Sequence, residues 1–160
     1  MEYKKSVATL KNLHSLRQQQ LIPRTRQEVF SFFETHSNLA KLTPPSLCLK
    51  VLSADSEKLK LNARYRYKIR LLGVPLSWTT LITRCEPPYF FEDVQLNGPY
   101  AYWKHVHQFE ETNDGTLMTD EVHYQLPLGW LGNTFGKKFA ETNLRKVFDY
   151  RRENLKKIFK

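Results

Sequence analysis

Polar and aromatic residues share one strand face in each of three consecutive segments between Phe90 and Pro127. Turn signals at Asn97-Gly98-Pro99 and Asn113-Asp114-Gly115 separate these segments, and side chains alternate between the two faces of a strand. The shared faces carry Phe91, Asp93 and Gln95 in the first segment, Trp103, His105, His107 and Phe109 in the second, and Met118, Asp120, Val122, Tyr124 and Leu126 in the third. A plain core face would be apolar throughout, whereas a mixed face is typical of a pocket wall.

Four further strands are predicted earlier in the chain, at His14–Ile22, Leu47–Ser53, Leu61–Leu72 and Leu76–Cys85. The third has the clearest alternation, which predicts one buried face and one face in water. Its apolar face carries Ala63, Tyr65, Tyr67, Ile69 and Leu71, and its basic face carries Arg64, Arg66, Lys68 and Arg70. In Leu76–Cys85, Trp78 lies on the same face as Thr80 and Ile82.

Helices are predicted at three places. Thr25 and Glu28 match a capping box, which marks a helix start, and apolar residues follow at helical spacing. Ser37–Leu42 predicts a second short helix, which Pro44-Pro45 ends because proline lacks the amide donor. A long amphipathic helix is expected from about Asn133 to Phe159, and Arg151 lies on its apolar stripe.

The order of elements predicts an α+β fold with a curved seven-stranded antiparallel sheet wrapped around the long C-terminal helix. Short turns join the last six strands, so these strands should pair with their neighbours in sequence. One face of such a sheet needs a cover, and the amphipathic helix can supply it. We expect residues 14–160 to form a single domain, residues 1–13 to be an N-terminal extension, and the candidate site to lie between sheet and helix.

Composition limits the classes of protein. The chain has 160 residues, 41% of them hydrophobic and 13% aromatic, which fits one folded domain. It lacks an apolar run of membrane-spanning length and a secretory signal, and Cys48 and Cys85 are expected to be free thiols, so a cytoplasmic location is predicted. The net charge of +9 is compatible with peripheral contact with anionic membranes. Nucleic-acid binding is not expected, because the basic row lacks interleaved aromatic residues.

Several motifs carry a resemblance to a known superfamily: Phe91-x-Asp93-x-Gln95, Gly98-Pro99, Trp103-x-His105-x-His107-x-Phe109, Gly115-Thr116, Asp120-Glu121 and Tyr124-x-x-Pro127-x-Gly129. With the element order, they resemble the helix-grip superfamily, which includes the birch-pollen allergen, START domains and polyketide cyclase/dehydrase-like proteins. Within it the chain is similar to a bacterial ligand-binding branch of the SRPBCC group. The resemblance covers about His14 to the C-terminus and implies a cavity that holds an apolar or amphipathic small molecule.

The paired histidines allow two kinds of chemistry. His105 and His107 project from one strand face, and with Asp120 they could bind zinc or iron, but the spacing fixes no third ligand. The same groups could transfer protons. A hydrogen-bonded network that includes Asp93 is favoured over both, so we expect no catalytic residue, no metal and no cofactor, and a protein that is metal-free when purified.

Arg151 has three possible environments. Its guanidinium could pair with Asp93 or Asp120, because an unpaired buried charge is costly. It could instead meet an acidic head group of a ligand, or lie at the rim of the pocket and reach water. The sequence does not distinguish these alternatives.

The favoured function is that of a binding or carrier protein for an apolar or amphipathic molecule such as a lipid, quinone or polyketide. The alternatives are a cyclase/dehydrase-type enzyme that uses the pocket His and Asp, and a regulatory interaction module. No phosphate-binding loop is present. The predicted ligand-binding residues are Tyr65, Tyr67, Trp78, Phe91, Asp93, Gln95, Trp103, His105, His107, Asp120, Tyr124 and Arg151.

Overall fold

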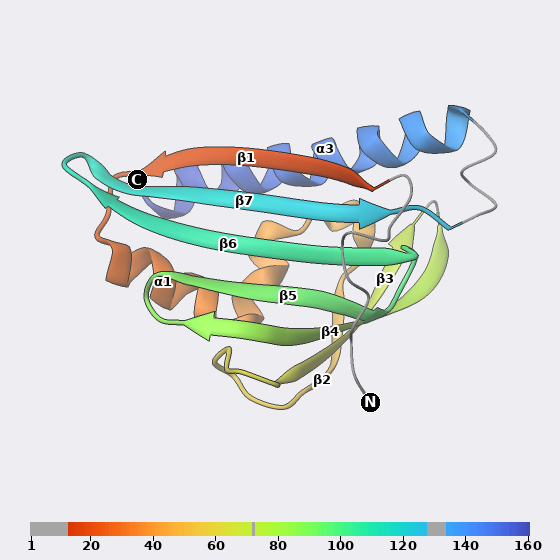
Figure 1. The fold of residues 1–160 in the computed structure, drawn as a ribbon, viewed down its shortest axis with the longest axis horizontal. Helices are drawn as coiled ribbons and strands as arrows, with labels where there is room; N and C mark the ends of the chain where they lie inside the picture. Colours follow the sequence, from red (N-terminus) through yellow and green to blue (C-terminus); the bar gives the residue numbers. More distant parts are fainter. Residues whose placement is uncertain (1–12, 72, 128–133) are drawn as a thin grey trace.

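The computed structural model describes residues 13–71, 73–127 and 134–160. Seven strands, two α-helices and two short 3-10 helices make up this part of the chain (Figure 1). In chain order they are β1 (His14–Ile22), α1 (Arg26–Glu34), η2 (His36–Leu42), η3 (Pro45–Leu47), β2 (Lys50–Ala54), β3 (Arg64–Leu71), β4 (Val74–Glu86), β5 (Phe90–Asn97), β6 (Tyr102–Thr112), β7 (Gly115–Gln125) and α3 (Thr134–Ile158).

All seven strands form one antiparallel sheet in the order β1-β7-β6-β5-β4-β3-β2. The sheet curves, and α1 and α3 both lie behind it in the view of Figure 1. The strands from β2 to β7 pair in sequence order, while β1 pairs with β7, so that Gln18 lies opposite Asp120. The predicted α+β fold and its curved seven-stranded sheet are therefore confirmed.

Helix α1 begins at the capping box that the sequence predicts. The Thr25 hydroxyl accepts a hydrogen bond from the Glu28 amide, and the Glu28 carboxylate accepts one from the Thr25 amide at 3.0 Å. These bonds satisfy amides that have no partner within the helix. Val29, Phe30 and Phe33 form the buried face of the helix.

The region between α1 and β3 departs from the predicted bounds. The predicted strand Leu47–Ser53 is wrong at its start, because Pro45–Leu47 forms η3 and β2 runs only over Lys50–Ala54. Proline fixes its own φ near the helical value, and Cys48 then turns the chain with a φ of 45°. Similarly, β3 begins at Arg64 rather than Leu61, after a turn in which Asn62 has a φ of 65°.

Helix α3 covers the concave face of the sheet with Leu144, Phe148 and Leu155, all buried. Leu144 and Phe148 pack with Trp103 of β6, whereas Leu155 joins a second cluster around α1. The predicted helix start at Asn133 lies outside the described residues. Apolar packing therefore holds α3 at two separate places along its length.

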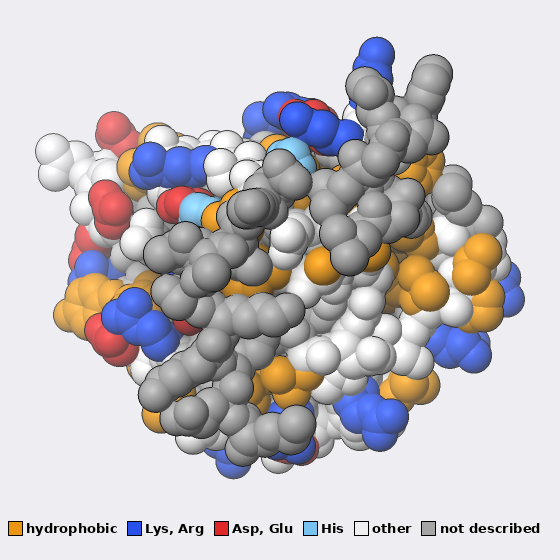
Figure 2. Space-filling view, turned by 45° about the vertical axis from the view of Figure 1, so that its right-hand side comes forward, with side chains coloured by type: hydrophobic (Ala, Val, Ile, Leu, Met, Phe, Trp, Pro, Cys, Tyr) orange, Lys and Arg blue, Asp and Glu red, His pale blue; other side chains and the backbone are white. Residues whose placement is uncertain are grey.

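The outer face of β3 is basic. Arg64, Arg66, Lys68 and Arg70 are exposed, as their alternation predicts. On the face that Figure 2 presents, visible Lys and Arg side chains lie in separate groups, with hydrophobic and other side chains between them. Within the described ranges, no helix has the length and apolar character that crossing a membrane requires.

Candidate functional site

A cavity of about 400 Å³ lies between the concave face of the sheet, the short helices and α3. Its wall is mainly apolar and includes Phe33, Leu39, Tyr67, Ile82, Leu144 and Phe148. Ser46 of η3 and Lys146 of α3 also line it and are exposed.

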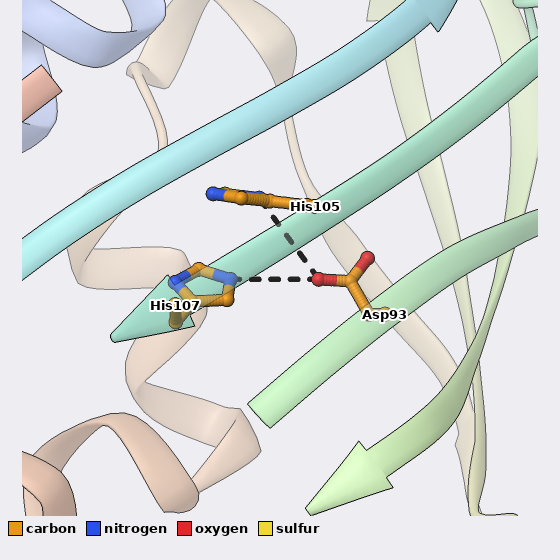
Figure 3. Close-up of side chains that lie close together, drawn as sticks. All are labelled: Asp93, His105 and His107. Atoms are coloured by element: carbon orange, nitrogen blue, oxygen red, sulfur yellow. Dashed lines mark ion pairs between the residues drawn. The ribbon is translucent and has the colours of Figure 1, made fainter. Parts of the chain in front are cut away.

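A polar cluster forms part of the same wall. Strand alternation points His105 and His107 of β6 to the concave side, and the register of β5 places Asp93 opposite His105 (Figure 3). Asp93 Oδ2 lies 3.4 Å from His107 Nε2 and 3.9 Å from His105 Nδ1. These three residues face the cavity from two neighbouring strands.

Asp120 supports both histidines from β7. Its Oδ1 accepts a hydrogen bond from His105 Nε2 at 3.0 Å and lies 2.8 Å from His107 Nδ1. The second contact is an ion pair without the alignment of a hydrogen bond, so the buried His107 Nδ1 has no hydrogen-bond partner among the residues that the structure describes. Asp120 does not itself line the cavity, and it therefore acts on the cavity through the histidines.

Arg151 of α3 connects the helix to this cluster. Its Nη1 atom lies 3.4 Å from both carboxylate oxygens of Asp120, and the residue is only 8% exposed. Of the three environments that the sequence left open, the structure shows the pairing with Asp120. Arg151 also lines the cavity, and within the described part of the chain its buried Nε has no hydrogen-bond partner.

The two histidines differ in their affinity for a proton. Burial, followed by the nearby His107, lowers the pKa of His105 to about 4, despite the opposing effect of Asp120. Burial also acts to lower the pKa of His107, but Asp120 and Asp93 outweigh it and raise that pKa above its ordinary value. For Asp120, Arg151 and His107 overcome burial and hold the pKa well below its usual range. The cluster therefore favours a neutral His105 beside an ionised Asp120.

Aromatic side chains fix the rings in place. Phe91 stacks on His107 with 4.1 Å between ring centroids, and the two imidazoles lie 3.8 Å apart. Phe148 approaches His105 from α3 with 5.6 Å between centroids. Because each ring is packed on a neighbour, the positions of the imidazole nitrogens are constrained.

Comparison with known proteins supplies a family. The model of the family described as polyketide cyclase / dehydrase and lipid transport matches residues 22–148. The chain belongs to this family. No curated protein sequence is similar enough to this chain to count as a match.

Solved structures share the fold of this polyketide cyclase and lipid transport family member. Protein CV1439 from Chromobacterium violaceum is 13% identical with a TM-score of 0.71, and the match covers 91% of this chain and 97% of that one. Ara h 8.0201 is 8% identical with a TM-score of 0.62, over 90% and 98% of the two chains. The di-domain ARO/CYC BexL from the BE-7585A biosynthetic pathway is 17% identical with a TM-score of 0.66, over 93% of this chain and 52% of that one. At these identities the likeness shows the helix-grip fold alone.

Nine of the twelve predicted ligand-binding residues line the cavity of this family member. They are Tyr65, Tyr67, Trp78, Phe91, Asp93, Trp103, His105, His107 and Arg151. Asp120 lies behind the histidines, and Tyr124 packs against His14 and Tyr100. The amide of Gln95 donates to the Tyr100 carbonyl at 2.7 Å and accepts from the Tyr100 amide, so it closes the turn between β5 and β6.

The prediction missed the apolar wall residues of the short helices and of α3. Leu39 and Leu42 of η2 line the cavity, as do Leu47 and Leu144. The three-residue spacing of Leu39 and Leu42 was the available signal, since 3-10 geometry places such residues on one face. The alternation of side chains along a strand cannot reveal these residues because they lie outside the sheet.

Proposed function

We propose that this chain binds an elongated, mostly apolar small molecule in the cavity and acts as a carrier rather than as a catalyst. The observation that carries the proposal is the cavity of about 400 Å³, whose mainly apolar wall also carries the His/Asp cluster. Ligand pockets of small molecules are about 300–1,000 Å³ in volume and combine apolar walls with a few placed polar groups.

The distribution of wall residues favours an amphipathic ligand. Trp78, Trp103 and Tyr100 form a packed aromatic group in the wall, with 5.1 Å between the two tryptophan centroids. Asp93 and His107 supply the polar part of the wall. The apolar body of the ligand therefore contacts the aromatic group, and its polar end contacts the His/Asp cluster.

The exterior fits occasional contact with an anionic membrane as a source of ligand. The exposed row Arg64, Arg66, Lys68 and Arg70 supplies positive charge on the outer sheet face. Such charges attract anionic lipid surfaces. Membrane contact and a cytoplasmic location are secondary parts of the proposal.

Uptake of N-phenyl-1-naphthylamine, a neutral dye that fluoresces in apolar surroundings, tests the carrier function. We expect saturable uptake by the native chain, weaker uptake by Trp103→Ala and His105→Ala, and most of the signal lost in Leu39→Trp, which fills the cavity. Leu52→Trp is the matched control, because Leu52 is 53% exposed on β2 and lies outside the cavity.

Equal uptake by the native chain and by Leu39→Trp, with each variant shown to be folded by circular dichroism, would contradict the proposal. Native mass spectrometry of gently purified protein, followed by extraction, would then identify any retained molecule. A recovered fatty acid, quinone or polyketide would establish its class.

A cyclase/dehydrase-type enzyme is the second candidate. It is favoured by His107, which faces the cavity between two carboxylates and has a raised pKa, as a general acid or base requires. Incubation with a linear β-polyketone should then give a cyclised or dehydrated product that His107→Gln fails to form. If the polyketone is bound and recovered unchanged, the carrier function is favoured.

A regulatory interaction module is the third candidate, and its cavity would have no ligand to bind. The volume and aromatic lining of the cavity count against it. Failure of the native chain to take up the dye, with no molecule recovered by extraction, would favour this candidate.

A further inference from the structure

The structure supplies a third metal ligand that sequence spacing could not fix. Asp93, on the neighbouring strand, lies opposite His105 in the register of β5 and β6. One ligand atom from each of Asp93, His105 and His107 lies within 4.8 Å of the other two. We propose that these three residues bind one divalent first-row transition metal ion of the zinc or ferrous class. The proposal goes beyond ligand carriage and does not rest on it.

Two of the separations between ligand atoms are close to those around such an ion. Zinc is held at about 2.0–2.2 Å by nitrogen and oxygen ligands, so two ligands in tetrahedral geometry are about 3.4 Å apart. Asp93 Oδ2 and His107 Nε2 are 3.4 Å apart. Asp93 Oδ2 and His105 Nδ1 are 3.9 Å apart, which requires a shift of about half an ångström to reach that value. Figure 3 shows both imidazoles and the Asp93 carboxylate converging from β5 and β6.

Asp120 occupies the position of a supporting carboxylate. A metal-binding histidine usually presents its second ring nitrogen to a carboxylate or carbonyl, which fixes the orientation of the ring. His105 Nε2 and His107 Nδ1 are 3.0 Å and 2.8 Å from the same Asp120 oxygen. The opposite nitrogens, His105 Nδ1 and His107 Nε2, are the two that face Asp93. Asp120 thus orients the His105 ring through a hydrogen bond, and its charge lies beside the second nitrogen of His107.

The two carboxylates differ in their cationic partners, and this difference favours a metal cation at Asp93. Arg151 pairs with Asp120. Within the described ranges, no Lys or Arg forms a salt bridge with Asp93, whose side chain is 15% exposed. A divalent ion supplies the positive charge that Asp93 otherwise receives only from a protonated histidine.

The cavity lies on the open side of the proposed site. Asp93, His105 and His107 line the cavity and Asp120 does not, so coordination positions left free by the three ligands face the cavity. Two imidazoles and one carboxylate suit zinc and ferrous iron better than magnesium or calcium, which prefer oxygen ligands throughout. The polar end of a bound molecule would meet the ion at these positions.

Titration of the tag-free full chain with Co²⁺ after treatment with EDTA tests the site. Mildly alkaline buffer keeps the imidazoles neutral, as metal binding requires. We expect one Co²⁺ per chain, visible absorption bands of a four- or five-coordinate ion, displacement by Zn²⁺, and a higher Tm with the metal. Asp93→Asn, which keeps the size of the side chain, should weaken binding at least about tenfold, as should the supporting change Asp120→Asn.

His123→Ala is the matched control. His123 lies on the outer face of β7, and its Nε2 is 2.9 Å from a Glu121 carboxylate oxygen. The substitution therefore removes an imidazole that lies beside a carboxylate but outside the cavity. The variant should bind Co²⁺ as the native chain does. The proposal is overturned if the native chain binds no Co²⁺, or if Asp93→Asn binds as tightly as the native chain. Because no apolar dye is present, either result leaves the carrier proposal to its own experiment.

Discussion

His105 is a buried imidazole in the wall of the cavity. Burial lowers its pKa from 6.5 to about 4. Between these two pH values, His105 therefore binds a proton in the unfolded chain but not in the folded chain. Stability contributed by a neutral His105 is therefore lost as the pH falls through this window. Asp120 acts in the same direction at lower pH, because its depressed pKa stabilises the fold only while it is ionised.

The first prediction concerns this dependence on pH. In metal-free protein, the free energy of unfolding should fall between pH 6.5 and about pH 4, and His105→Gln should reduce that slope. His107 contributes with the opposite sign, since its raised pKa favours folding at pH below 6.5 and the benefit is lost as the pH rises through the folded value. Urea unfolding at a series of pH values measures the slope, with His123→Gln as the control. Equal slopes for the native chain and His105→Gln would contradict the prediction.

The second prediction concerns the buried pair of Asp120 and Arg151. Asp120→Asn should destabilise the fold by about 3–5 kcal/mol, because it leaves the guanidinium buried without its carboxylate. Arg151→Met in the same chain should restore part of that loss, which a double-mutant cycle by urea unfolding would measure. Strictly additive losses would show that the two residues do not interact.

Helix α3 provides the third prediction, at the scale of one element. Phe148 is 3% exposed and packs between the sheet and the helix, so Phe148→Ala should cost about 3–5 kcal/mol of stability. Ile158 on the same helix is 39% exposed, and Ile158→Ala serves as the control with a change within about 0.5 kcal/mol. A loss below about 1 kcal/mol for Phe148→Ala would show that this side chain is not part of the core.

Elements with a regular pattern could be predicted from sequence, and irregular ones could not. Alternation across Tyr65 and Tyr67 gives β3, and Thr25 with Glu28 gives the start of α1. The segment from Pro45 to Lys50 has no period, since a 3-10 turn and the left-handed residue Cys48 interrupt it. Its strand was therefore placed too early.

The alternation of side chains along a strand predicts which face a site residue occupies but not its role. It placed Asp93, His105 and His107 together on the cavity wall. It placed Gln95 on the same face, although the amide of that residue bonds to the Tyr100 backbone instead. Neither alternation nor spacing gives the distances between side chains on different strands. The sequence alone therefore could not predict that Asp93 and Asp120 lie on opposite sides of the imidazoles.

At the scale of the whole molecule, the pairing of β1 with β7 sets a condition on how the chain folds. Gln19 and Thr119 are hydrogen-bonded across 100 positions of sequence. Strands β2 to β7 can join as each is made, but β1 has no strand to pair with until β7 is present. Contacts between distant segments slow folding, because closing a long loop costs conformational entropy before the contact stabilises the chain. The wall of the cavity includes residues of α3, so the cavity is complete only when this C-terminal helix has packed on the sheet.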